Sequence, residues 1–181
     1  GLIEETAKLI VPLIILAVAY PRTAQGGVVI GVAAGAGFAV LETMGYGFNA
    51  LLGNGGGLGA VDATLLVRGV FAPAGHITWT GVLCAAIWFW RSGRRPGLGA
   101  LATIGAYLGA IILHTVWDVA ASIPLHVIVG LLSLAVLVRV VVAAHHAQGS
   151  DGAPQPADVP WTGAPPMGPY GQGPTLPPTI G

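Results

Sequence analysis

Charged side chains are scarce in this sequence: they make up 8% of its 181 residues, while apolar residues make up 54%. An average soluble domain carries about 25% charged residues, so this chain has too little polar surface for a soluble globular fold. Its seven basic residues are balanced by seven acidic ones, which excludes the basic surface of a nucleic-acid-binding protein. Cys84 is the only cysteine, which excludes a disulfide-stabilised scaffold. A polytopic membrane protein remains.

Long apolar runs predict an all-α, polytopic transmembrane helix bundle. A helix needs about 20 apolar residues to cross the hydrocarbon core of a bilayer. We expect five spans, at residues 2–20, 26–49, 62–91, 98–121 and 123–144, with a glycine-rich connector at residues 52–60. The third span is expected to break near Pro73, because an internal proline removes a backbone hydrogen bond. Glycines four residues apart predict close-packed helix faces at Gly27, Gly31 and Gly35 and at Gly105 and Gly109.

The last part of the chain, residues 148–181, differs in composition from the transmembrane domain expected at residues 1–147. It holds nine of the fourteen prolines, many glycines and only two charges, Asp151 and Asp158. Such a segment buries too little apolar surface to fold, so we expect a disordered tail. At the other end, the sequence opens directly on an apolar run without a signal-peptide layout, and we expect it to be part of a longer chain.

Basic residues mark one side of the membrane. Arg22 follows the first span, Arg91, Arg94 and Arg95 follow the third, and Arg139 closes the fifth, whereas the connectors after the second and fourth spans carry no basic residue. By the positive-inside rule the basic connectors face the cytoplasm, and so does the tail. The six arginines to one lysine, with abundant Gly, Ala and Val, indicate a bacterial protein, so we expect a multi-pass protein of the bacterial plasma membrane.

Four ionisable side chains lie at one expected depth. Glu5, Glu42, His76 and His114 each stand fifteen or sixteen residues from the cytoplasmic end of their spans. At a rise of 1.5 Å per residue, this places them about 22–24 Å above the cytoplasmic face, in the outward half of the membrane. Ionisable groups inside spans are costly and are functional candidates by default. We therefore expect these four side chains to converge in one polar site.

Helical spacing places three more ionisable side chains near the same depth, namely Glu4, Lys8 and Asp118. Glu4 and Glu5 lie four and three residues before Lys8, and His114 lies four residues before Asp118. Two adjacent carboxylates in a low dielectric cannot both ionise freely, which suits a general acid or base. Plainer interpretations exist for single residues, because an intramembrane His is more often an interhelical hydrogen-bond partner. A glutamate can likewise pair structurally with Lys8 or Arg68.

The same residues resemble a known sequence pattern. Its elements are EETAK at residues 4–8, GFAVLE at 37–42 followed by Tyr46, Arg68, HITWTG at 76–81 and HTVWD at 114–118. In this order the chain resembles the PrsW family of intramembrane metalloproteases, within the wider group of CAAX prenyl proteases and Abi proteins. Where that wider group commonly has FxxxH, this chain has Glu42, as PrsW-like members do.

The resemblance implies hydrolysis of a peptide bond in a membrane-protein substrate, such as an anti-sigma factor, near the extracytoplasmic side. As the base that activates water we expect Glu4 or Glu5, and we favour Glu5. His76, His114 and Glu42 would hold a divalent metal such as Zn²⁺, or position the water and the oxyanion. Asp118 would orient His114 or act as a further ligand. There is no HExxH motif, so a zincin-type site is not expected.

Two other classes of protein also fit this pattern. A proton- or cation-coupled membrane transporter places Glu, His and Asp at one level, usually with broken helices at the midplane. A non-catalytic, Abi-like membrane scaffold is the third alternative. His126, at the entrance of the last span, is expected to be interfacial.

Overall fold

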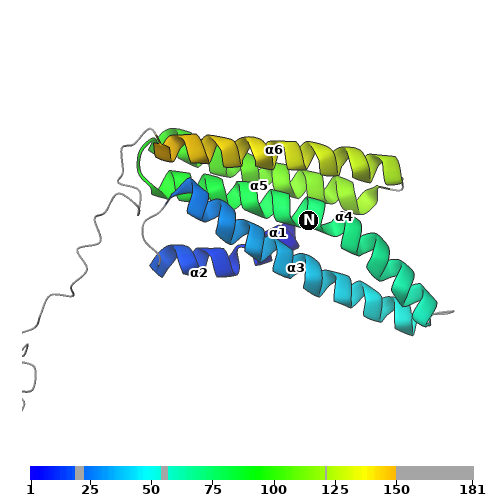
Figure 1. The fold of residues 1–181 in the computed structure, drawn as a ribbon. Helices are drawn as coiled ribbons and strands as arrows, with labels where there is room; N and C mark the ends of the chain where they lie inside the picture. The colour runs from blue at the N-terminus through cyan, green and yellow to red at the C-terminus, as the bar shows by residue number, and fades with distance from the viewer. Residues whose placement is uncertain (19–22, 54–56, 121, 150–181) are drawn as a thin grey trace, which may run out of the picture.

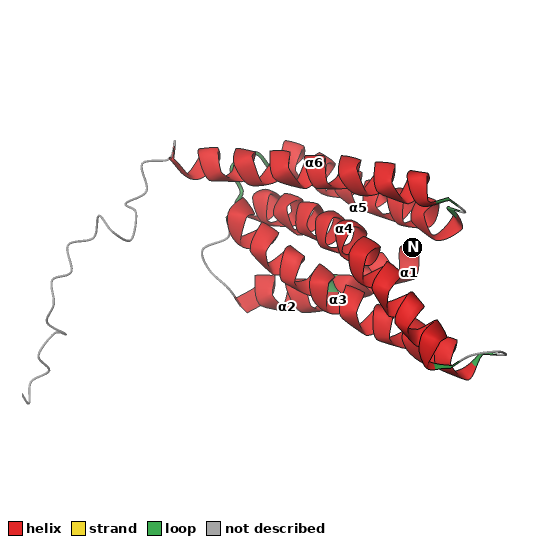
Figure 2. Ribbon diagram, turned by 45° about the vertical axis from the view of Figure 1, so that its right-hand side comes forward, coloured by secondary structure: helices red, strands yellow, loops and turns green. Residues whose placement is uncertain are grey.

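The computed structural model describes residues 1–18, 23–53, 57–120 and 122–149, and the regular elements in these ranges are all α-helices (Figure 2). They are α1 (Leu2–Lys8), α2 (Ile10–Val18), α3 (Ala24–Leu52), α4 (Leu58–Arg91), α5 (Pro96–Val119) and α6 (Ile123–Gly149). Four of them, α3 to α6, are long and apolar enough to cross a membrane, so the all-α membrane fold is as predicted. The tail from residue 150 onward lies outside the described residues, as do Arg22 and residues 54–56.

The first expected span, residues 2–20, is two short helices rather than one. The helix of α1 ends at Lys8, Leu9 forms a turn, and α2 starts at Ile10. Pro12 supplies the reason, because it has no N–H with which to bond the Lys8 carbonyl four residues earlier, and its ring crowds that carbonyl. Apolar length alone predicts a continuous span here, because the run is long enough to cross a membrane.

The third expected span is one continuous helix, although it contains a proline. No break occurs at Pro73, since α4 continues through it from Leu58 to Arg91. The helix instead bends, so that its N-terminal end runs beside α3 and its C-terminal part also lies against α5 and α6 (Figure 1). A proline inside a helix bends it when packing on both sides of the proline keeps the helical turns in place. The expected interruption was therefore wrong, and the proline produces a bend.

Helices α3 and α4 pack at very short range along a stripe of glycines. A Cβ atom added at Gly27, Gly31 or Gly35 would lie only 2.3–2.5 Å from a backbone oxygen of α4. These positions have no room for any side chain, which confirms the predicted packing face. By contrast, a Cβ at Gly105 or Gly109 would meet nothing within 4 Å, so the second predicted glycine face was wrong.

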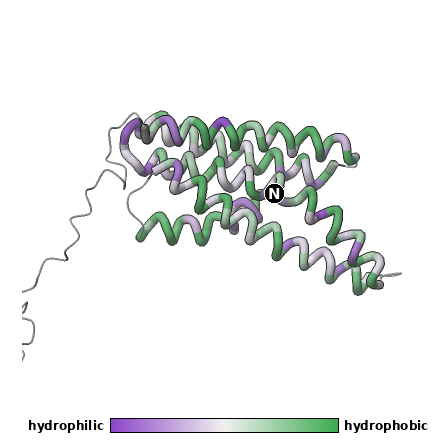
Figure 3. Tube along the Cα trace, viewed as in Figure 1, coloured by the Kyte–Doolittle hydropathy of each residue, from purple (hydrophilic) through white to green (hydrophobic). Residues whose placement is uncertain are grey.

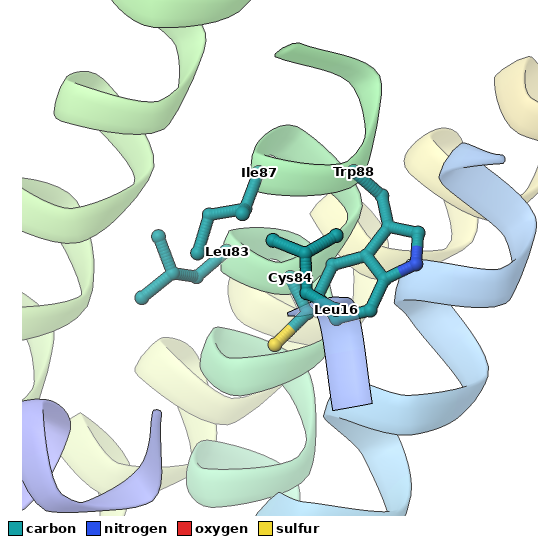
Figure 4. Close-up of a cluster of buried hydrophobic side chains, with 5 residues drawn as sticks. All are labelled: Leu16, Leu83, Cys84, Ile87 and Trp88. Atoms are coloured by element: carbon teal, nitrogen blue, oxygen red, sulfur yellow. The ribbon is translucent and has the colours of Figure 1, made fainter. Parts of the chain in front are cut away.

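The central helix of the bundle is α4, which contributes to three buried apolar clusters. In one of them, Leu16 of α2 lies against Cys84 and Trp88 of α4 (Figure 4). A second joins α4 to α5 and α6 around Trp79, and a third joins α3, α4 and α6 around Ala85. Every other long helix therefore packs on α4, which fixes the position of His76 in the middle of the bundle.

The helix ends alternate between two ends of the molecule. The α4–α5 turn and the C-terminal end of α6 lie at one end, whereas the α5–α6 turn and the tip of the α3–α4 hairpin lie at the other (Figure 1). Short α1 lies between these ends and contacts both α3 and α5. It brings a hydrophilic segment into the middle of an otherwise apolar bundle (Figure 3).

The glycine stripe leads to a stability prediction. Gly31→Ala should lower the free energy of unfolding by about 1–3 kcal/mol, because its methyl group would overlap the Thr80 carbonyl and force α3 away from α4. The matched control is Gly37→Ala on the exposed face of α3, where a Cβ meets nothing within 4 Å. Denaturant unfolding in detergent, followed by circular dichroism, measures both. Equal stability of the two variants would show that the helices do not depend on this close approach.

Candidate active site

Helix α1 presents two acidic side chains and one basic side chain to the interior of the bundle. Glu5 is 0% exposed and Lys8 is 4% exposed. A hydrogen bond of 2.6 Å between Thr6 Oγ1 and Tyr107 Oη ties the helix to α5. Because Pro12 ends α1 after two turns, this short helix can take its own direction between α3 and α5, and its charged face is buried there.

One half of the site is built around His114 of α5. Its Nδ1 lies 2.7 Å from Glu5 Oε1 in a buried hydrogen bond, and since a carboxylate only accepts, the proton of this bond belongs to Nδ1. Its Nε2 lies 2.9 Å from Glu4 Oε2 and 3.5 Å from Asp118 Oδ1. Neither His114 Nε2 nor Glu4 Oε2 has a hydrogen bond of acceptable geometry. His114 Nε2 and Glu4 Oε2, two buried atoms with lone pairs, therefore face each other at 2.9 Å without a hydrogen bond between them.

The other half is built around His76 of α4. Its Nδ1 lies 2.7 Å from Lys8 Nζ, and its Nε2 lies 2.8 Å from Glu42 Oε2 on α3. The same oxygen of Glu42 is 2.7 Å from Arg68 Nη2. The guanidinium of Arg68 in turn stacks on Tyr46, with its carbon 3.8 Å from the ring centroid. Lys8 joins the two halves, because its Nζ is also 2.5 Å from Glu5 Oε1.

Aromatic rings shield this network from the membrane. The His76 and His114 rings lie 5.1 Å apart, and Trp79 packs against both, at 6.0 and 5.2 Å between centroids. The Trp79 Nε1 donates to Ser133 Oγ of α6, which keeps the indole in place. Phe38 of α3 lies 5.5 Å from the His76 ring on another side. Such apolar surroundings strengthen every charge–charge interaction within the network.

These side chains fit a divalent metal ion. Glu5, His76 and His114 are all buried, and each offers one ligand atom such that all three atoms lie within 4.8 Å of one another. Carboxylate and imidazole are ordinary ligands of catalytic zinc. Buried atoms without hydrogen-bond partners support the fit: they include Glu4 Oε2, Glu5 Oε2 and His114 Nε2. The four carboxylates of the network also outnumber its two cationic side chains, Lys8 and Arg68, by two charges.

The structure thus brings together all six side chains named from the sequence, namely Glu4, Glu5, Glu42, His76, His114 and Asp118. In the described residues, the group whose geometry suits a metal ion is Glu5, His76 and His114, whereas the set predicted from the sequence has Glu42 in place of Glu5. Lys8 was expected only to neutralise the carboxylate pair, yet it contacts His76 directly. The i,i+3 and i,i+4 spacing within EETAK indicates that Lys8 faces the two glutamates. The contact of Lys8 with His76, 68 residues further along the chain, could not be found from that spacing.

A cavity of about 210 Å³ lies next to this network. Arg68 and Phe71 of α4, Trp117 of α5 and His126 of α6 are among its lining residues. Trp117 connects it to the histidines, because its ring lies 6.0 Å from Trp79. His126, expected to be interfacial, packs edge-on against Trp117 at 4.6 Å between ring centroids.

A protein-family model described as PrsW family intramembrane metalloprotease matches residues 1–144. The chain belongs to this family. No curated protein and no solved structure matches it. The PrsW match covers every residue of the network and confirms the resemblance found in the motifs. Membership identifies a membrane protein of an intramembrane protease family, and the buried Glu–His–His group agrees with the metallopeptidase class.

The Arg68–Glu42 ion pair leads to a second prediction. Both side chains are mostly buried, at 20% and 14% exposed, so the pair should be coupled by about 0.5–3 kcal/mol. We expect a double-mutant cycle of Arg68→Met and Glu42→Gln, measured by unfolding in detergent, to give this coupling. Arg139→Met, on an exposed part of α6, should show no coupling with Glu42→Gln. Additive effects of Arg68→Met and Glu42→Gln would mean that the contact contributes no net stability.

Proposed function

We propose that this protein is an intramembrane endopeptidase of the bacterial plasma membrane. It hydrolyses a peptide bond of a membrane-protein substrate, for which a membrane-bound anti-sigma factor is the proposed type, near the extracytoplasmic side. The observation that carries the proposal is the buried group of Glu5, His76 and His114 within a bundle of apolar helices. Burial of three ionisable side chains inside a membrane protein costs free energy, and a catalytic role explains their presence better than a packing role does.

The geometry favours Glu4 over Glu5 as the base. Glu5 is fully buried, and its Oε1 is held by both Lys8 and His114. The side chain of Glu4 is 39% exposed, so water can reach the carboxylate, while its Oε2 is buried beside His114 Nε2 without a hydrogen bond. We therefore assign Glu4 the removal of a proton from the attacking water, whose oxygen bonds to the scissile carbonyl carbon. As the C–N bond breaks, Glu4 returns this proton to the leaving amine.

The remaining side chains of the network are proposed to bind the metal ion or to orient the two histidines. His76, His114 and Glu5 would hold the metal, proposed to be Zn²⁺, which when bound polarises the scissile carbonyl as a Lewis acid. Glu5 accepts from His114 Nδ1 and keeps this ring in position, while Asp118 Oδ1 lies 3.5 Å from its Nε2. Glu42 keeps the ring of His76 in position, while Arg68 holds Glu42. Each histidine is thus contacted by a carboxylate from another helix, His114 by Glu5 and His76 by Glu42.

Substrate is proposed to approach through the cavity beside the network. Its aromatic walls, Phe71 and Trp117, suit an apolar side chain of a transmembrane or juxtamembrane segment. Ser122 and Ile123, next to the α5–α6 turn, are among the residues that line the cavity. This turn lies at the end of the bundle opposite the α4–α5 turn and the C-terminal end of α6 (Figure 1). If the basic end faces the cytoplasm, as the positive-inside rule requires, cleavage takes place toward the exterior and the tail is cytoplasmic.

A cation-coupled carrier is the second candidate, and the helix break at Leu9 favours it. Carriers commonly interrupt helices next to buried charged groups, as α1 and α2 do here beside Glu5 and Lys8. Reconstitution into vesicles separates the classes. Cleavage of a single-pass substrate selects the peptidase, cation flux without cleavage selects the carrier, and neither activity selects a scaffold.

The proposed division of labour between the two adjacent glutamates is testable. Glu4→Gln should lower the rate of substrate cleavage at least about 100-fold while leaving bound metal unchanged, because only the base is lost. Glu5→Gln should lose both cleavage and metal, since it removes a ligand. Asp62→Asn, an exposed acid at the start of α4, is the control and should keep both. Full cleavage by Glu4→Gln would remove that residue from the mechanism.

Metal dependence is a separate prediction. Chelator treatment should abolish cleavage, and added Zn²⁺ should restore it. In His114→Ala, which removes one of three ligands, Zn²⁺ should fail to restore cleavage, and elemental analysis should find no bound metal. Undiminished cleavage by metal-free protein would refute the metal assignment, while the peptidase activity itself would stand.

A further inference from the structure

Lys8 is the positive group closest to the proposed metal ligands. Its side chain is fully buried, and its Nζ lies 2.5 Å from Glu5 Oε1 and 2.7 Å from His76 Nδ1. These two residues are two of the three that form the metal group. The ammonium therefore already lies against atoms that a metal ion would need.

The donor properties of lysine determine the state of His76. An ammonium only donates, so the Nδ1 of His76 accepts from Lys8 and the ring carries its proton on Nε2. This Nε2 lies 2.8 Å from Glu42 Oε2. With Nδ1 accepting from Lys8 and the proton on Nε2, neither ring nitrogen offers a free lone pair to a metal. By contrast, His114 Nε2 has no hydrogen-bond partner.

A metal ion and the ammonium cannot occupy this place together. Two like charges a few ångströms apart in a low dielectric repel strongly, and the lone pair of His76 Nδ1 serves only one partner. Phe38 offers the ammonium another favourable position, because Lys8 Nζ already lies 4.6 Å from the centroid of its ring. Rotation of the lysine toward this ring would free His76 Nδ1 and would leave Glu5 Oε1 with His114 as its one remaining partner in the network.

We propose that Lys8 is a built-in cation that competes with the divalent metal for Glu5 and His76, so that metal binding requires its displacement. The proposal depends on the metal site of the proposed function but not on peptidase activity. Lysine then sets how tightly the site holds metal, and it keeps the carboxylates neutralised while no metal is bound.

Titration of the purified protein with Co²⁺, followed by the visible absorption of the bound ion, tests this competition. Lys8→Met, which keeps the length of the side chain but removes its charge, should bind Co²⁺ at least about tenfold more tightly than the wild type, a change within the range for residues beside metal ligands. Lys8→Arg retains the charge and should show no gain. Adding His76→Ala to Lys8→Met should abolish the gain.

Equal or weaker Co²⁺ binding by a folded Lys8→Met would overturn the proposal. If that variant does not fold, ¹⁵N NMR of histidine-labelled wild type decides, with His76 assigned by its loss in His76→Ala. Metal-free protein should show His76 protonated on Nε2, and Zn²⁺ should change the signal of its Nδ1; a proton on Nδ1 without metal refutes the competition. Tighter metal binding without cleavage in any form would instead refute the proposed function alone.

Discussion

The buried carboxylate of Glu5 is the interaction on which the rest of the site depends. It accepts from Lys8 on its own helix and from His114 on α5, and through Lys8 it reaches His76 on α4. An unpaired carboxylate at this depth would cost several kcal/mol, so its partners must stay in place for the bundle to be stable. The same contacts hold three helices at fixed distances and hold both histidines with defined protonation.

Close packing of α3 on α4 complements this polar centre. The absence of side chains at Gly31 and Gly35 lets the α3 backbone approach α4 near His76, which brings Glu42 within reach of that ring. Apolar clusters then fix α4 against α2, α5 and α6. The polar network is thus built at the point where the central helix is most constrained, and its geometry does not rely on flexible loops.

Membership of the PrsW family and this geometry complement each other. The family match identifies the class, and the network suggests how the work is divided among side chains of similar chemistry. Glu4 and Glu5 are neighbours in sequence, yet one is partly exposed and the other fully buried, because α1 turns only one face toward the interior. Different surroundings would allow these two identical side chains to serve as the proposed base and the proposed ligand.

Composition and periodicity alone determined the membrane class, the all-helical fold and the set of ionisable groups that meet, because hydrophobic length and equal depth follow directly from sequence. Tertiary structure decided the rest. Pro12 ends a helix while Pro73 only bends one, since the packing around each proline differs. Packing likewise decided that Gly31 lies at a helix contact whereas Gly105 does not. Packing also places Glu5 near both histidines and Glu42 against His76: depth is set along one helix, but rotation and partner are set only when the helices pack.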